Sequence, residues 1–228
     1  MIPLKDSTKS PVFPIVNLSI IVVTILVYLF EVSIEPEQLN QLYYTFGVIP
    51  VEVIDNFFPG LYFTPILISF ITTLFIHGGW MHLIGNMLFL WVFGDNVEGK
   101  LGHFNYLLFY LLAGAMATLS HVISTPFSTL PVVGASGAVA GVLGAYIISF
   151  PKSRVLALVP IFIIFTLVEI PAVIFIAIWF LLQLFNGFVS FGGDVATVAY
   201  WSHIGGFIAG VLLIKIMAPR ESKFDYYQ

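Results

Sequence analysis

The sequence predicts an all-α membrane protein, a bundle of six transmembrane helices with both termini on the cytoplasmic side. Apolar residues make up 59% of the 228 residues and charged residues only 9%, against about 45–50% and about 25% in soluble domains. The mean hydropathy is +1.03. The apolar residues also gather in long runs, at least six of which have about the length that a bilayer core requires.

The composition excludes several classes of protein. Eight Lys and Arg and twelve Asp and Glu are too few to cover the surface of a soluble enzyme of this size. No basic face is available for nucleic acid, so we expect no such partner. The chain has no cysteine, which excludes disulfides, thiolate catalysis and Cys-ligated metals. We expect neither a metal nor a cofactor. We expect the protein to be embedded in the lipid bilayer.

The predicted spans follow one another along a single domain of residues 1–228. The first apolar run, about 12–32, has no cleavage site behind it, so we expect a retained span rather than a signal peptide. A mixed outer loop follows over 33–80. The other five spans are expected at about 81–97, 104–123, 133–150, 171–187 and 198–217.

Positive charge decides the number of spans. Two more apolar stretches, Leu61–Ile76 and Val155–Glu169, are long enough to raise the count. With six spans all eight Lys and Arg lie on one side, whereas either extra span divides them between the two sides. Because cytoplasmic loops carry the excess of Lys and Arg, we expect six spans in the cell membrane. This topology places Ser128 and Asp194 outside and Ser153 inside.

Four hydrogen-bonding side chains lie near the outer ends of three predicted spans. His82 begins the second span, and Asn86 follows on the same helical face. Ser136 lies near the start of the fourth span, and His203 about five residues into the sixth. At about 1.5 Å per residue, all four come within roughly 10 Å of the outer ends. Polar groups at such depth usually face the protein interior or a wet cavity.

These residue types favour acyl transfer. A serine hydroxyl becomes a nucleophile when a base removes its proton, and His203 is such a base if it packs against Ser136. Asn86 and His82 can donate N–H groups to the developing oxyanion, as can backbone N–H groups at a helix N-terminus. Asp194 lies in an outer loop, so we expect a Ser–His dyad rather than a triad.

Each residue also has an ordinary interpretation. A lone serine in a membrane helix usually bonds to its own backbone, and a lone histidine or asparagine often joins two helices. His103 and His121, near the ends of the third span, are assigned to that structural role. The common depth and complementary chemistry of the other four favour a reactive site.

Three motifs resemble those of the rhomboid intramembrane serine proteases. They are HGGWMHLIGN from His77 to Asn86, GASG around Ser136, and HIGGFIAG from His203. The resemblance covers most of the chain and implies a six-helix bundle of rhomboid type. It implies an endopeptidase that cuts single-span membrane proteins near the outer face. Ser136 would be the nucleophile, His203 the base, His82 and Asn86 the oxyanion donors, and His77 a supporting residue.

Glycines around the two reacting residues are expected to bring their helices together. Gly134 and Gly137 flank the serine, while Gly206 and Gly210 follow the histidine by three and seven residues. Small residues let helix backbones approach closely in lipid. We expect Gly206 to set the distance between the serine and the histidine.

Two positions depart from the pattern of the family. Many rhomboids have a Trp-Arg pair in the first outer loop, where this chain has Ile68-Ser69. Some members place an aromatic ring four residues after the serine, where this chain has Ala140. The sequence therefore does not reveal what holds the ring of His203.

Two other functions stay open at this point. An inactive rhomboid-like protein would bind membrane proteins without cutting them, although the presence of both Ser136 and His203 favours a protease. A transporter would use discontinuous helices, and the break at Glu169-Ile170-Pro171 is compatible with one. The natural substrate and the oligomeric state are also left open.

Overall fold

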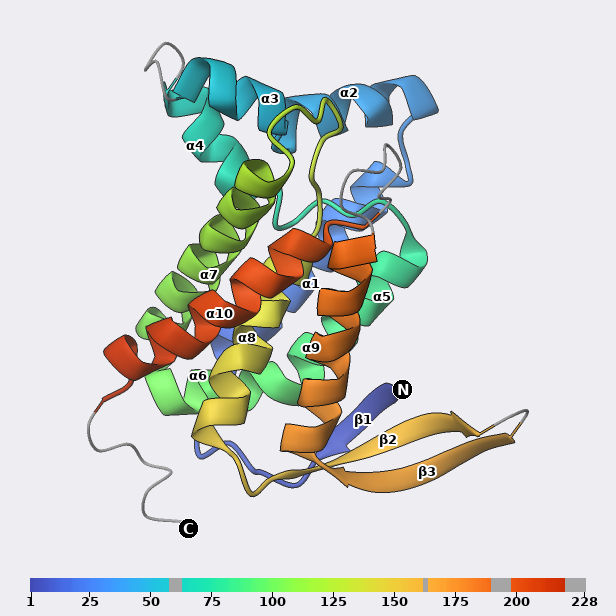
Figure 1. Cartoon of the computed structure of the whole chain (residues 1–228), viewed down its shortest axis with the longest axis vertical. Helices are drawn as coiled ribbons and strands as arrows, with labels where there is room; N and C mark the ends of the chain where they lie inside the picture. Colours follow the sequence, from blue (N-terminus) through green and yellow to red (C-terminus); the bar gives the residue numbers. More distant parts are fainter. Residues whose placement is uncertain (58–62, 162–163, 190–197, 220–228) are drawn as a thin grey trace.

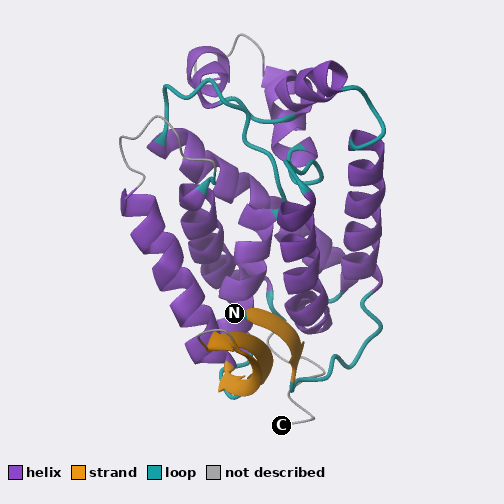
Figure 2. Cartoon of the chain, turned by 90° about the vertical axis from the view of Figure 1, so that its right-hand side faces the viewer, coloured by secondary structure: helices purple, strands orange, loops and turns teal. Residues whose placement is uncertain are grey.

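The computed structural model describes residues 1–57, 63–161, 164–189 and 198–219, and it is mostly helical (Figure 1). Its elements are β1 Ile2–Asp6, α1 Ile15–Glu31, α2 Pro36–Phe46, α3 Pro50–Glu52, the π-helix η1 Val53–Phe57, α4 Phe63–Thr72, α5 Trp80–Phe89, the π-helix η2 Leu90–Gly94, α6 Asp95–Leu101, α7 His103–Ser124, α8 Ser136–Ser149, β2 Arg154–Ile161, β3 Ile164–Pro171, α9 Ala172–Val189 and α10 Tyr200–Met217. Helices α2 and α3 lie across one end of the helical bundle, called here the α2 end. The strands lie at the opposite end, called the sheet end (Figure 2).

Three helices of the described residues, α7, α9 and α10, are long and apolar enough to cross a membrane. Helices α1 and α8 are apolar but shorter. The region of the predicted span 81–97 is also helical. It is divided among α5, η2 and α6, which follow one another without a break from Trp80 to Leu101. The chain is therefore a mostly helical membrane protein.

The expectation of an all-α fold is wrong at the sheet end. Strands β1, β2 and β3 form an antiparallel sheet in that order. The described residues of the apolar stretch Val155–Glu169 lie in β2 and β3, which pair from Arg154 opposite Pro171 to Ile161 opposite Ile164. Its many β-branched residues suit extended backbone. An apolar run by itself does not distinguish a strand from a helix.

The described residues of the segment expected to be an outer loop, 33–80, are largely helical. Helix α2 begins with a capping box in which the side chains of Glu35 and Gln38 accept each other's backbone N–H groups. Pro36 occupies the first helical position, where a missing N–H costs nothing. Beyond α2, Val48 forms an isolated bridge with Val132. This bridge ties the 33–80 segment to the loop that leads into α8.

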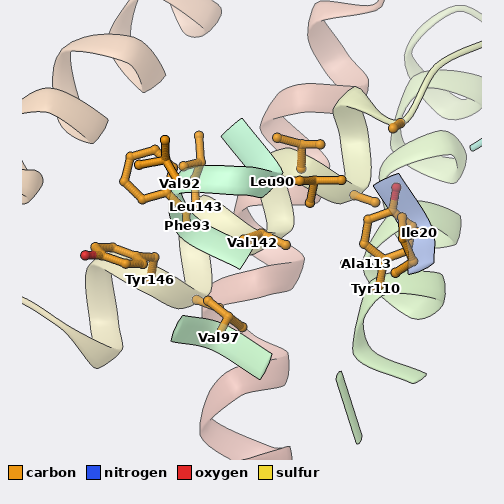
Figure 3. Packing of buried hydrophobic residues seen from close by; sticks show 14 of the residues in the cluster. Ile20, Leu90, Val92, Phe93, Val97, Tyr110, Ala113, Val142, Leu143 and Tyr146 are labelled. Carbon is orange, nitrogen blue, oxygen red and sulfur yellow. The ribbon is translucent and has the colours of Figure 1, made fainter. Parts of the chain in front are cut away.

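Helix α8 forms the centre of the bundle. Every residue from Gly137 to Tyr146 is buried, as suits a helix that is apolar on all sides. Phe93 of η2 packs edge-on against Tyr146 with ring centroids 4.9 Å apart. Leu143 and Leu90 belong to the same core (Figure 3). The core therefore encloses the helix that begins at Ser136.

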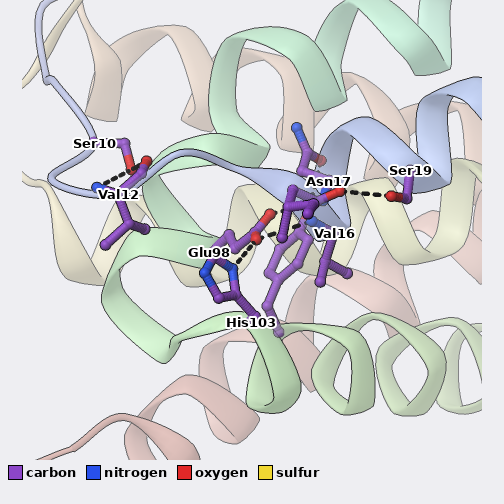
Figure 4. A network of polar contacts seen from close by, with 9 residues as sticks. Ser10, Val12, Val16, Asn17, Ser19, Glu98 and His103 are labelled. Carbon is purple, nitrogen blue, oxygen red and sulfur yellow. Dashed lines mark hydrogen bonds and ion pairs between the residues drawn. The ribbon is translucent and has the colours of Figure 1, made fainter.

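A buried carboxylate fixes the start of α1. Glu98 of α6 accepts the backbone N–H groups of Val16 at 3.0 Å and Asn17 at 2.7 Å, which have no partner within their own helix (Figure 4). Nδ1 of His103 also donates to Glu98, at 2.5 Å. The amide of Asn17 donates to the carbonyl of Leu90 in η2 at 3.0 Å. These bonds hold α1, η2, α6 and α7 together.

Candidate active site

Ser136 is the first residue of α8. The first helical bond here joins the N–H of Val139 to the carbonyl of Ala135 at 2.9 Å. The N–H groups of the first turn therefore have no partner one turn back. Helix α8 has 14 residues and is about 21 Å long, whereas the 22 residues of α7 extend about 33 Å. The serine thus starts a short helix inside the bundle (Figure 1).

Gly134 allows the ring of His82 to lie against the loop that precedes Ser136. Its φ of 124° belongs to a region that side chains rarely adopt. A Cβ at this position would lie 2.4 Å from Cε1 and 2.6 Å from Nε2 of His82. Only glycine both adopts this φ readily and leaves the space that the His82 ring occupies. The predicted oxyanion donor and the predicted nucleophile are thereby brought to the same place.

His77 and Asn86 form a buried pair. Nδ2 of Asn86 donates to Nε2 of His77 at 3.0 Å, and the backbone N–H of Ala135 points to the same nitrogen at 3.4 Å. An accepting Nε2 places the ring proton on Nδ1, which lies 3.4 Å from the carbonyl oxygen of Phe75. Burial lowers the pKa of His77 to about 4, so the ring is neutral and able to accept at pH 7. His77 therefore connects α5 to the loop before α8.

Two residues that the sequence analysis missed hold the backbone of His77. Its N–H donates to both carboxylate oxygens of Glu31 at 3.2 Å. Its carbonyl accepts the hydroxyl of Tyr43 at 3.0 Å. Glu31 is a buried acid at the end of an apolar helix, and this unusual position was the signal available in the sequence.

His203 of α10 is 8% exposed and contacts α9. Its Nδ1 lies 2.8 Å from Oε1 of Gln183. The ring centroid lies 6.0 Å from that of Trp179, also on α9, and 6.2 Å from that of Tyr200. Gln183 was also missed. Its signal was an amide within the strongly apolar run of α9, where a polar side chain needs a partner.

The four residues predicted to react line one cavity of about 1140 Å³. His82 and Asn86 come from α5, Ser136 from α8 and His203 from α10. Polar side chains of the loop before α8, among them Ser128 and Thr129, line the same cavity. In the described part of the chain no hydrogen bond joins Ser136 to His203. The hydrogen bond between a catalytic nucleophile and its base is often long or poorly aligned before substrate binds.

Helices α8 and α10 touch through their glycines. A Cβ on Gly206 would lie 2.0 Å from the carbonyl oxygen of Gly137, and one on Gly210 would lie 1.9 Å from that of Gly141. Neither position has room for a side chain. The predicted close approach of the two helices is therefore present. Asp194, the acid considered for a triad, lies outside the described residues.

Several known proteins are similar in sequence to this chain. The Rhomboid domain family matches residues 65–220. Rhomboid-like protein 11, chloroplastic, of Arabidopsis thaliana is 29% identical over 163 residues, which are 69% of this chain and 55% of that protein. Rhomboid protease GluP of Bacillus subtilis is 32% identical over 155 residues, 68% of this chain and 27% of GluP. Rhomboid protein 1, mitochondrial, of Saccharomyces cerevisiae is 36% identical over 96 residues, 40% of this chain and 28% of that protein.

The aligned part of the chain spans between 27% and 55% of the length of these three relatives. The family match runs from α4 beyond α10, and it contains all the residues of the cavity. The chain belongs to the rhomboid family.

Proposed function

We propose that this protein is an intramembrane serine endopeptidase. It cuts the transmembrane segments of single-span membrane proteins near the outer face by a dyad of Ser136 and His203. The main support for the proposal is the cavity that three helices line with the hydroxyl of Ser136, the imidazole of His203 and two N–H donors, those of His82 and Asn86. A relative, GluP of Bacillus subtilis, is named a rhomboid protease.

The proposed reaction follows from the positions of these groups. Oγ of Ser136 attacks the scissile carbonyl while Nε2 of His203 takes the hydroxyl proton. The oxyanion is stabilised by N–H groups of Asn86, His82 and the first turn of α8. His203 then gives the proton to the leaving amine, and water hydrolyses the acyl-enzyme by the same route.

Six crossings are proposed for the membrane. They are α1, the continuous run of α5, η2 and α6, and then α7, α8, α9 and α10. Lys5 of β1, Lys100 of α6 and Arg154 of β2 belong to elements at the sheet end (Figure 1), which supports a cytoplasmic sheet end. The cavity would then open toward the outer face. We place the protein in the cell membrane, although relatives are named chloroplastic and mitochondrial.

Cleavage of a fluorogenic transmembrane peptide in liposomes tests the proposal. Ser136→Ala should abolish cleavage and labelling by a fluorophosphonate, His203→Ala should nearly abolish them, and EDTA should have no effect. Ser149→Ala is the matched control, because it makes the same change at the other end of α8.

Two outcomes contradict the proposal. Cleavage by Ser136→Ala at the wild-type rate would remove the serine from the mechanism. A folded wild-type protein that neither cleaves nor takes the label would instead be an inactive rhomboid-like protein or a transporter.

A further inference from the structure

We propose that Gln183 is the positioning residue for His203, so that the reactive group is a Ser136–His203–Gln183 arrangement. The inference rests on the proposed protease function. Its basis is the 2.8 Å contact between Oε1 of Gln183 and Nδ1 of His203. An amide oxygen only accepts hydrogen bonds, so Nδ1 carries the ring proton. Nε2 then keeps its lone pair for the proton of the serine.

Helix α9 supplies the side chains that hold the ring of His203, which α8 does not provide. Ala140, four residues after the serine, is fully buried and has no ring to place beneath His203. Trp179 and Gln183 lie one turn apart on α9, and both approach the histidine ring. The indole restricts the ring by packing, and the amide fixes its rotation and its tautomer.

A neutral amide suits this position better than an acid. Helix α9 is strongly apolar along its 18 residues, and an ionised carboxylate within such a segment is costly. An amide without a partner would also be unfavourable there. The hydrogen bond to His203 satisfies the amide oxygen of Gln183, and it holds the histidine without adding a charge.

The role of Gln183 involves no proton transfer of its own. As the bond forms between Oγ of Ser136 and the scissile carbon, the serine proton moves to Nε2 of His203. The imidazolium keeps its Nδ1–H bond to Gln183. The proton then passes to the leaving amine nitrogen as the carbon–nitrogen bond breaks. Gln183 keeps the ring oriented through both steps.

Two substitutions of Gln183 show whether His203 needs its hydrogen-bond acceptor or only a side chain of its size. Gln183→Met keeps the length of the side chain and removes the acceptor oxygen, so kcat should fall about 10–100-fold, by analogy with the loss of the partner that orients a metal-bound histidine. KM should stay within about twofold, because the substrate does not bind through this bond. Leu181→Met, at a position of α9 that is 61% exposed, is the matched control and should cleave like the wild type.

Gln183→Glu restores the acceptor and adds a charge. It should cleave faster than Gln183→Met, and the acid limb of its kcat/KM profile should move to higher pH, because a carboxylate stabilises the imidazolium. Within residues 1–57, 63–161, 164–189 and 198–219, the other titratable side chains that act on His203 are His82 of α5 and His121 of α7, with Tyr200 on its own helix. All three are the same in every variant.

The tautomer can be read without any activity. In protein labelled with ¹⁵N-histidine, the His203 signals, assigned by their loss in His203→Asn, should show a protonated Nδ1. Gln183→Met should show a mixture of tautomers. A wild-type Nε2–H tautomer, or a Gln183→Met variant with wild-type kcat and wild-type signals, would overturn the inference. A protein that shows the expected tautomers but cuts nothing would refute the protease proposal while supporting the positioning bond.

Discussion

Gly206 offers a test of how closely α8 and α10 must pack for the reaction. In Gly206→Ala the new Cβ would lie 2.0 Å from the carbonyl oxygen of Gly137 and 3.1 Å from Cβ of Ala117. Real Cβ atoms essentially never approach another heavy atom within 3.0 Å. The nearest atom is a backbone oxygen, which cannot rotate away, so the helices must separate by about 1 Å.

A displacement of this size at the site should be costly for the reaction. Gly206 lies one turn from His203, and Gly137 follows Ser136 directly, so the shift moves the base away from the nucleophile. A misplacement of about 1 Å can lower a rate about 10²-fold. Overpacking should also lower the free energy of unfolding by about 1–3 kcal/mol. A single added methyl group is therefore enough to force the two helices apart.

The assay compares cleavage rate, fluorophosphonate labelling and thermal unfolding in detergent for the same preparation. Ile208→Val is the control, because Ile208 is 49% exposed and lies away from the contact with α8. Gly206→Ala should remain folded while its cleavage falls about 10²-fold. If Gly206→Ala folds and cleaves like Ile208→Val, the contact between α8 and α10 at Gly206 does not set the distance between Ser136 and His203. This conclusion would hold even if both residues are essential.

Four further predictions concern topology, the oxyanion site, the acid and the sheet end. In this cysteine-free chain, a single cysteine at Ser128 should react with an impermeant maleimide in intact cells and one at Ser153 should not; the reverse pattern contradicts six spans. Asn86→Ala should slow cleavage by up to about 10²–10³-fold, and an unchanged rate would remove it as an oxyanion donor. Asp194→Asn should keep most activity, since a loss as large as that of the histidine variant would indicate a triad. Burial raises the pKa of Asp6 from 3.8 to about 6, so its contribution to stability is present below about pH 4 and is lost as pH rises through about 6. Asp6→Asn should therefore have a higher Tm than the wild type at pH 8, with little difference at pH 4, and equal Tm values at both would contradict this.

The sequence by itself determined the class and the family. Composition indicates a membrane protein because 9% charged residues cannot solvate a domain of this size. The motifs around His77, Ser136 and His203 indicate a rhomboid, and the family match confirms this. Long apolar runs also located α7, α9 and α10 to within a few residues. Six spans, cytoplasmic termini and the roles of the site residues stay predictions.

Only the tertiary structure decided which distant residues meet. The described residues of the apolar run Val155–Glu169 form strands, and β2 pairs with Ile2–Asp6, about 150 residues away. The ring of His203 is held by Gln183 from another helix, and the backbone of His77 by Glu31, 46 residues earlier. Hydropathy and motifs describe each segment separately. These bonds depend on how the segments pack, because each buried polar group takes whichever partner the neighbouring helix brings within reach.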